Sequence, residues 1–214
     1  MNSFKNFCGI IFLFIISLTT LTFAQSDFEG KIVLKILDEG NSFDVDYFIK
    51  GDKMKMEMNA AEGAMAILFN KSENKTYMIM PQQSMYMEFN VMDMMGSEEL
   101  DADDPDITKT GEYLDINGYK CEKWIIKENN EIVEAWMTDE LGSFFMMDNP
   151  FAMNSKTWQQ ELAGNFFPMR VDVVEGSEKQ KVLEVVSVNK MSLSNDLFVI
   201  PAGYQKFDMP NMGR

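Results

Sequence analysis

Residues 43–59 read FDVDYFIKGDKMKMEMN, and apolar side chains alternate with polar ones on both sides of the Gly51-Asp52 pair. A period of two places every second side chain on the same face of a β-strand. Two such runs separated by two turn-forming residues are typical of a β-hairpin. This stretch decides the fold: we expect strands at 43–49 and 53–59, with Met54, Met56 and Met58 on one face.

Similar short runs, separated by turn-forming residues, recur along the chain. They predict further strands at 28–37, 65–70, 76–80, 85–89, 119–127, 131–138, 169–175, 181–191 and 197–200. Strands 119–127 and 131–138 should pair, with Trp124 and Trp136 facing each other across the ladder. Many short strands joined by short turns indicate a mostly β fold, a meander of antiparallel strands.

Residues 90–106 break the alternation, because they carry seven acidic side chains and no basic one. Asp101, Asp103 and Glu112 match positions 1, 3 and 12 of an EF-hand loop, but Pro105 and Asp106 stand where a ligand and the turn glycine belong. A run of like charges is typical of a solvated loop. We therefore interpret this segment as a loop and not as a calcium site.

Residues 141–165 also lack alternation and include a dense apolar run. Ser155 and Gly164 bracket a short segment with the cap and the stop of a helix. A contiguous apolar run outside a strand must be covered or must cover something else. We expect this segment to pack on the sheet as a lid, with one or two short helices.

The first 24 residues have the features of a secretory signal peptide. Lys5 supplies a positive charge, residues 9–21 are mostly apolar, and Thr22-Phe23-Ala24 forms a small-x-small cleavage site before Gln25. The apolar stretch is short for a membrane span. We expect a soluble periplasmic or secreted protein without a stable membrane anchor, consisting of one β-rich domain over residues 25–214.

Composition excludes several classes of function. The chain has 34 acidic against 19 basic side chains and a net charge of −15, which argues against nucleic acid and anionic membrane surfaces as partners. It has no histidine, which removes Ser-His-Asp and Cys-His arrangements. Cys8 leaves with the signal peptide, so Cys121 has no disulfide partner and is expected to be a buried small hydrophobe. We predict a non-enzymatic protein without a cofactor.

Several short motifs resemble those of a known family. They are FEGKI (28–32), KGDKMKMEM (50–58), TGE (110–112), INGYKCEK (116–123), WMTD (136–139), FP (167–168) and FVIPAGY (198–204). In this order and spacing they resemble the exported bacterial family of domain of unknown function forty-four twelve. The resemblance implies a LolA/LolB-like fold, a curved antiparallel half-barrel that holds lipid or acyl chains against helices. The arginines of this chain are Arg170 and Arg214, and neither matches the functional arginine of the lipoprotein carrier, so lipoprotein transfer itself is not implied.

Methionine supplies the strongest functional signal, because eleven of the twenty methionines lie between Met54 and Met95 and most are two apart. Methionine is unbranched and polarizable, and it adapts to irregular apolar shapes. We predict a groove for an apolar ligand, a lipid or an acyl chain, lined by seven methionines and closed by four residues of the lid. These candidate residues are Met54, Met56, Met58, Met78, Met80, Met85 and Met87 in the groove, with Phe144, Phe145, Met146 and Trp158 over it.

Two other interpretations of the same methionines stay open. The methionines could fill the core of a structural or interaction domain without any small ligand, since burial alone stabilises each by about 1.5–3 kcal/mol. Alternate methionines on a strand also place thioethers about 7 Å apart on one face, and thioethers select copper(I). The sequence does not identify a protein partner.

Overall fold

A computed structural model describes residues 28–38, 40–60, 63–89, 106–128, 131–144 and 166–207. These residues form one sheet of twelve strands and two short 3₁₀ turns. The strands are β1 (Glu29–Asp38), β2 (Asn41–Lys50), β3 (Lys53–Ala60), β4 (Gly63–Asn70), β5 (Lys75–Met80), β6 (Met85–Phe89), β7 (Asp106–Ile116), β8 (Tyr119–Glu128), β9 (Glu131–Thr138), β10 (Phe167–Glu175), β11 (Glu178–Lys190) and β12 (Gln205–Lys206). The 3₁₀ turns are η1 (Pro81–Gln83) and η2 (Asn195–Phe198).

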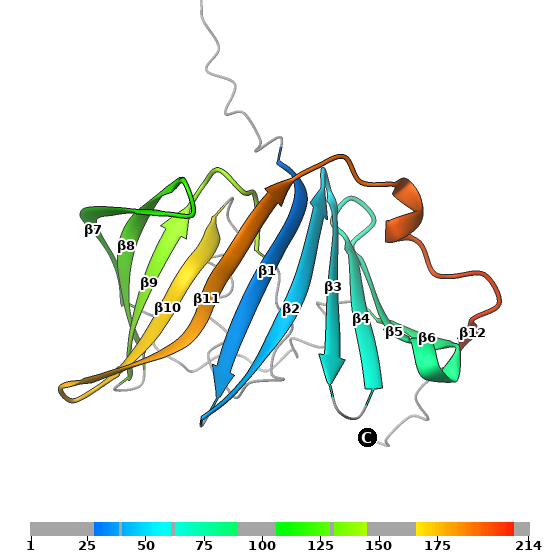
Figure 1. Cartoon of the computed structure of the whole chain (residues 1–214), viewed down its shortest axis with the longest axis horizontal. Coiled ribbons are helices and arrows are strands. Elements are labelled where there is room, and N and C mark those ends of the chain that lie inside the picture. The colour runs from blue at the N-terminus through cyan, green and yellow to red at the C-terminus, as the bar shows by residue number, and fades with distance from the viewer. Residues whose placement is uncertain are drawn as a thin grey trace, which may run out of the picture.

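The sheet consists of two antiparallel meanders that meet in its middle. Its strand order is β12-β6-β5-β4-β3-β2-β1-β11-β10-β9-β8-β7, so β1 lies between β2 and β11 (Figure 1). All neighbours pair antiparallel except β12, which lies parallel to β6. The sheet is curved, as Figure 1 shows. It is also open, since its outermost strands β7 and β12 lie at opposite ends of the order and do not pair with each other. The prediction of a mostly β fold built on a curved, open antiparallel sheet is confirmed.

Gly30 allows the two meanders to approach closely. It pairs with Lys190 across the β1–β11 seam. A Cβ on Gly30 would lie 2.3 Å from the carbonyl oxygen of Asn189 and 2.9 Å from the ring of Phe28. Any larger residue would therefore push β11 or Phe28 away.

Both faces of the sheet carry an apolar cluster. The main cluster lies on one face of β1–β4 and β8–β11 and includes Ile32, Tyr47 and Met169. The second cluster lies on the other face of β4 and β5, where Leu193 and Phe198 pack against Leu68. The chain that follows β11 runs across this second face as a strap (residues 191–200), visible beside β3 and β4 in Figure 1.

The first predicted hairpin is confirmed, with strands β2 and β3 pairing from Lys50–Lys53 to Val45–Met58 around the Gly51-Asp52 turn. Two expectations are wrong, and one strand was not predicted. Residues 197–200 are not a strand, because Leu197 and Phe198 belong to the 3₁₀ turn η2. The edge strand β7 was not predicted, because most of its side chains are exposed and its alternation is weak. Trp124 pairs with Ala135, whereas Trp136 pairs with Lys123, so the two indoles lie on opposite faces.

Several predictions concern residues outside the described ranges. The signal peptide over residues 1–24, most of the acidic loop, and the helix between Ser155 and Gly164 all fall there. They stay predictions. The described residues contain no helix longer than the four residues of η2.

Candidate functional site

The predicted methionines lie on one face of β3–β6, and the strand register demonstrates this directly. Met56 pairs with Ile67, Ile67 with Met78, and Met78 with Met87. Directly paired residues in an antiparallel sheet point to the same side. The face therefore contains eight methionines, and we call it the methionine face. Its members are Met54, Met56, Met58, Met65, Met78, Met80, Met85 and Met87.

Burial decreases along the methionine face from β3 toward the edge of the sheet. Met54, Met56 and Met58 are only 5%, 5% and 8% exposed and belong to the main core. The hydroxyl of Tyr47 donates a hydrogen bond to the sulfur of Met54 at 3.1 Å. The four methionines of β5 and β6 are instead half-buried. The face thus has a core part on β3 and an accessible part on β5 and β6.

The accessible part is a block of two methionine pairs. Met78 lies opposite Met87, and Met80 lies opposite Met85. Opposite Cβ atoms in such pairs are about 4.5–5.5 Å apart, and the two pairs are separated by about 7 Å along each strand. Four flexible thioether side chains therefore share a small area of half-exposed surface.

The predicted lid residues are only partly described. Phe144 is buried, and its ring centroid lies 5.7 Å from that of Tyr47 and 5.1 Å from that of Phe167. It packs against Tyr47, the residue whose hydroxyl bonds to Met54. Phe145, Met146 and Trp158 lie outside the described residues.

Thr76 places a polar group in this apolar surface. It pairs with Phe69, which in turn pairs with Met54, so its side chain lies on the methionine face. Thr76 is completely buried, and its hydroxyl has no hydrogen-bond partner among the described residues. Such an orphaned hydroxyl costs about 1–3 kcal/mol unless a water or a ligand satisfies it.

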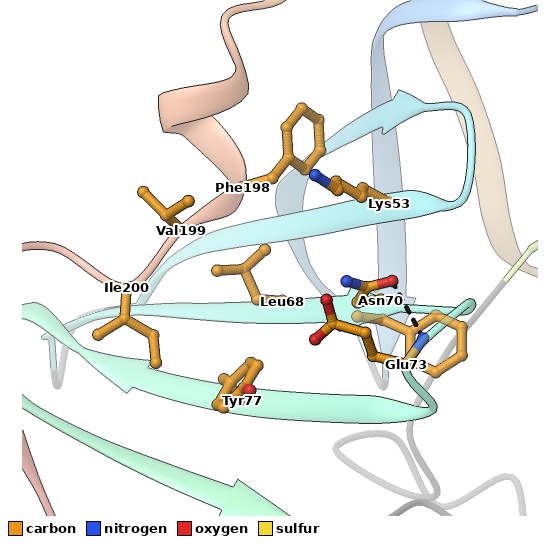
Figure 2. A pocket seen from close by; sticks show the side chains of 9 residues that line it. Lys53, Leu68, Asn70, Glu73, Tyr77, Phe198, Val199 and Ile200 are labelled. Carbon is orange, nitrogen blue, oxygen red and sulfur yellow. Dashed lines mark hydrogen bonds between the residues drawn. The ribbon is translucent and has the colours of Figure 1, made fainter.

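A pocket of about 250 Å³ lies on the opposite face of the sheet, below the strap. Figure 2 shows Val199 and Ile200 of the strap on one side and Leu68 and Tyr77 of the strands on the other. This pocket was not predicted from the sequence. A signal existed in β4, whose sequence GAMAILFN is apolar at consecutive positions, because a strand that is apolar on both faces needs a cover on each.

Metal-binding groups do not gather in the described part of the chain. No three histidine, cysteine, aspartate or glutamate side chains there are placed to hold a metal ion. Burial raises the pKa of Cys121 to about 11, which disfavours the nucleophilic thiolate. Its thiol donates to the carbonyl of Tyr119 at 3.3 Å. None of the described helical segments has the length and apolarity to cross a membrane.

The family described as domain of unknown function (DUF4412) matches residues 28–204, a range that contains eleven of the twelve strands completely. The chain belongs to the DUF4412 family. No curated protein matches this DUF4412 chain in sequence.

Solved structures show the same fold in other proteins. An uncharacterized conserved protein from Thermus thermophilus has a TM-score of 0.52 at 8% identity, over 85% of the DUF4412 chain and 90% of its own. The structure of PNGF-II in a C2 crystal form has a TM-score of 0.53 at 16% identity, over 85% of the chain. The DUF4412 chain spans 31% of the length of PNGF-II, so the match corresponds to one part of that larger protein. At these identities the likeness concerns the fold alone.

Proposed function

We propose that the protein is an exported, soluble, non-enzymatic carrier that binds a lipid or acyl chain on the methionine face. The observation that carries this proposal is the decrease of burial across a continuous apolar surface. Met56 is in the core, whereas Met78 and Met87, which extend the same row, are half-buried. A purely structural core has no need for four flexible apolar side chains on a half-exposed edge, whereas an apolar ligand would cover them.

The chemistry of the face suits a flexible apolar chain. Thioether side chains adapt to a ligand that has no fixed shape, and a buried core on β3 provides a rigid base beside them. In this proposal the signal peptide is cleaved between Ala24 and Gln25, and residues 145–165 help to close the site.

Uptake of a fluorescent fatty acid by delipidated protein tests the proposal. The variant Met78→Ser/Met87→Ser should fold and bind the probe at least about tenfold more weakly, because it places two hydroxyls in the apolar contact. Met191→Ser is the matched control, since Met191 is 49% exposed and lies on the strap and not on this face. Absence of probe binding by wild-type protein, or equal binding by both variants, would leave the methionines as a structural surface.

Copper(I) binding is the second candidate, and the pairing of Met78 with Met87 and of Met80 with Met85 favours it. Thioethers are soft ligands that prefer copper(I). Replacing all four methionines with leucine separates the two candidates, because leucine keeps the apolar surface and removes the sulfur. A carrier of acyl chains should retain the fatty-acid probe in this variant, whereas a copper site should lose the metal in a competition with a colorimetric copper(I) chelator.

A further inference from the structure

The pocket below the strap is independent of the methionine face, because it lies on the other side of the sheet. Its apolar wall comes from Leu68 and Tyr77 on the strands and from Phe198, Val199 and Ile200 on the strap (Figure 2). Its volume of about 250 Å³ is slightly below the range of about 300–1,000 Å³ that is typical of ligand pockets. A pocket of this size suits a small molecule.

The strap is held in place, so the pocket exists before a ligand arrives. The carboxylate of Glu29 accepts a hydrogen bond from the backbone N–H of Leu193 at 2.5 Å and pairs with Lys50 at 3.1 Å. Lys50 also donates to the carbonyl oxygen of Leu193. At the start of η2, the hydroxyl of Ser194 accepts from the N–H of Asp196 at 3.2 Å. A site that is already ordered loses less conformational entropy when it binds.

Three polar side chains line this pocket, those of Lys53, Asn70 and Glu73. The side-chain oxygen of Asn70 accepts from the hydroxyl of Ser72 at 2.9 Å and from the N–H of Glu73 at 3.4 Å. This leaves the amide nitrogen of Asn70 as a donor toward the cavity, as Figure 2 shows. The ammonium group of Lys53 lies beside the ring of Phe198 at the pocket wall and forms no ion pair with any residue that the structure describes (Figure 2). The carboxylate of Glu73 lies on the same side of the pocket as Asn70 (Figure 2).

We propose that this pocket binds a small zwitterion with an apolar side chain, an apolar amino acid. The ligand carboxylate would accept hydrogen bonds from Lys53 and Asn70, and its ammonium group would donate to Glu73. Its side chain would lie between Leu68 and Ile200. A ligand with only a carboxylate would meet Glu73 as a like charge, and a ligand with only an ammonium group would meet Lys53 in the same way.

Isothermal titration calorimetry with four ligands tests the inference. L-leucine and L-phenylalanine present both charges, hexanoate lacks the ammonium group and pentylamine lacks the carboxylate. The two amino acids should bind at least about tenfold more tightly than either analogue, since each analogue leaves one charged group of the pocket unpaired. No detectable heat with the amino acids, or equal affinity for hexanoate, would overturn the proposal.

Two charge variants and one control locate the site. Lys53→Gln and Glu73→Gln should each weaken L-leucine binding by about tenfold or more, because each removes one charge-assisted hydrogen bond. Lys71→Gln changes an exposed lysine in the same turn that does not line the pocket and should leave binding unchanged. Equal affinities in all three variants would contradict the assignment. Fatty-acid uptake should be unaffected by these changes, so the two proposals can fail separately.

Discussion

Replacing Thr76 with valine should stabilise the protein, which is unusual for a change in a core. The hydroxyl of Thr76 is completely buried and unpaired among the described residues, so its removal recovers a desolvation cost of about 1–3 kcal/mol. The methyl group of valine occupies nearly the same volume. We expect a net gain of about 1–2 kcal/mol in the free energy of unfolding, or about 2–8 °C in Tm for a chain of this size.

Thr138 provides the matched control. It is also buried, but its hydroxyl accepts a hydrogen bond from the backbone N–H of Glu140 at 3.3 Å. Thr138→Val should therefore destabilise the protein by about 0.5–1.5 kcal/mol. Urea denaturation of delipidated protein measures both changes, and the m-value should stay constant.

The opposite result would refute the reasoning. If Thr76→Val destabilises the delipidated protein as much as Thr138→Val does, the hydroxyl of Thr76 has a hydrogen-bond partner in solution, such as a water molecule. Thr76→Ser separates packing from polarity, because it keeps the hydroxyl and removes one methyl group, at a cost of about 0.8 kcal/mol. A gain from valine that disappears when fatty acid is added would indicate that the hydroxyl contacts the ligand.

Three further predictions concern other parts of the sheet. Met56→Ala should lower the free energy of unfolding by about 2–5 kcal/mol because Met56 is in the core, whereas Met87→Ala at its half-buried site should lower it by about 1 kcal/mol or less. Similar losses for both variants in urea denaturation would contradict the division of the methionine face into a core part and an accessible part. Cys121 should react with a thiol reagent far more slowly in native than in unfolded protein. With a pKa of about 11, only about one thiol in a thousand is ionised at pH 8. Fast labelling of the native protein would show that Cys121 is not buried. The N–H of Leu193 and the ammonium of Lys50 lower the pKa of Glu29 below 4.5, so this group stabilises the fold above that pH and the contribution is lost as the pH falls through the lowered pKa. Glu29→Gln should accordingly lower Tm at pH 7 but not near pH 2, and an equal loss at both pH values would exclude this linkage.

Alternation was sufficient to predict most of the sheet. It identified β2 and β3 because one of their faces is apolar and the other is charged, which fixes the register. It failed for β7, where Tyr113 and Leu114 are both exposed and adjacent, since an edge strand has little core to cover. It also failed near Phe198, where a short apolar run fits a strand and a 3₁₀ turn equally well.

The candidate site was predictable only in part. The sequence placed Met56 and Met87 on the same face correctly. It could not show that one is in the core and the other near the edge, because burial depends on which strands lie farther out in the sheet. The lining of the pocket below the strap could not be predicted, because Leu68 and Ile200 are far apart in sequence and come together only where the strap crosses the sheet.

The position of β1 has a consequence for the order in which the chain can fold. Residues of β1 contact β2 as soon as the first hairpin is made, but their other neighbour, β11, ends at Lys190. Until the chain has been made as far as Lys190, the edge of β1 that will pair with β11 is unpaired, and the apolar face of the first meander is incomplete. Pairing over such a long separation is slow because a large loop must close first. The newly made chain therefore passes through a stage in which β1, a central strand of the finished sheet, is an exposed edge strand.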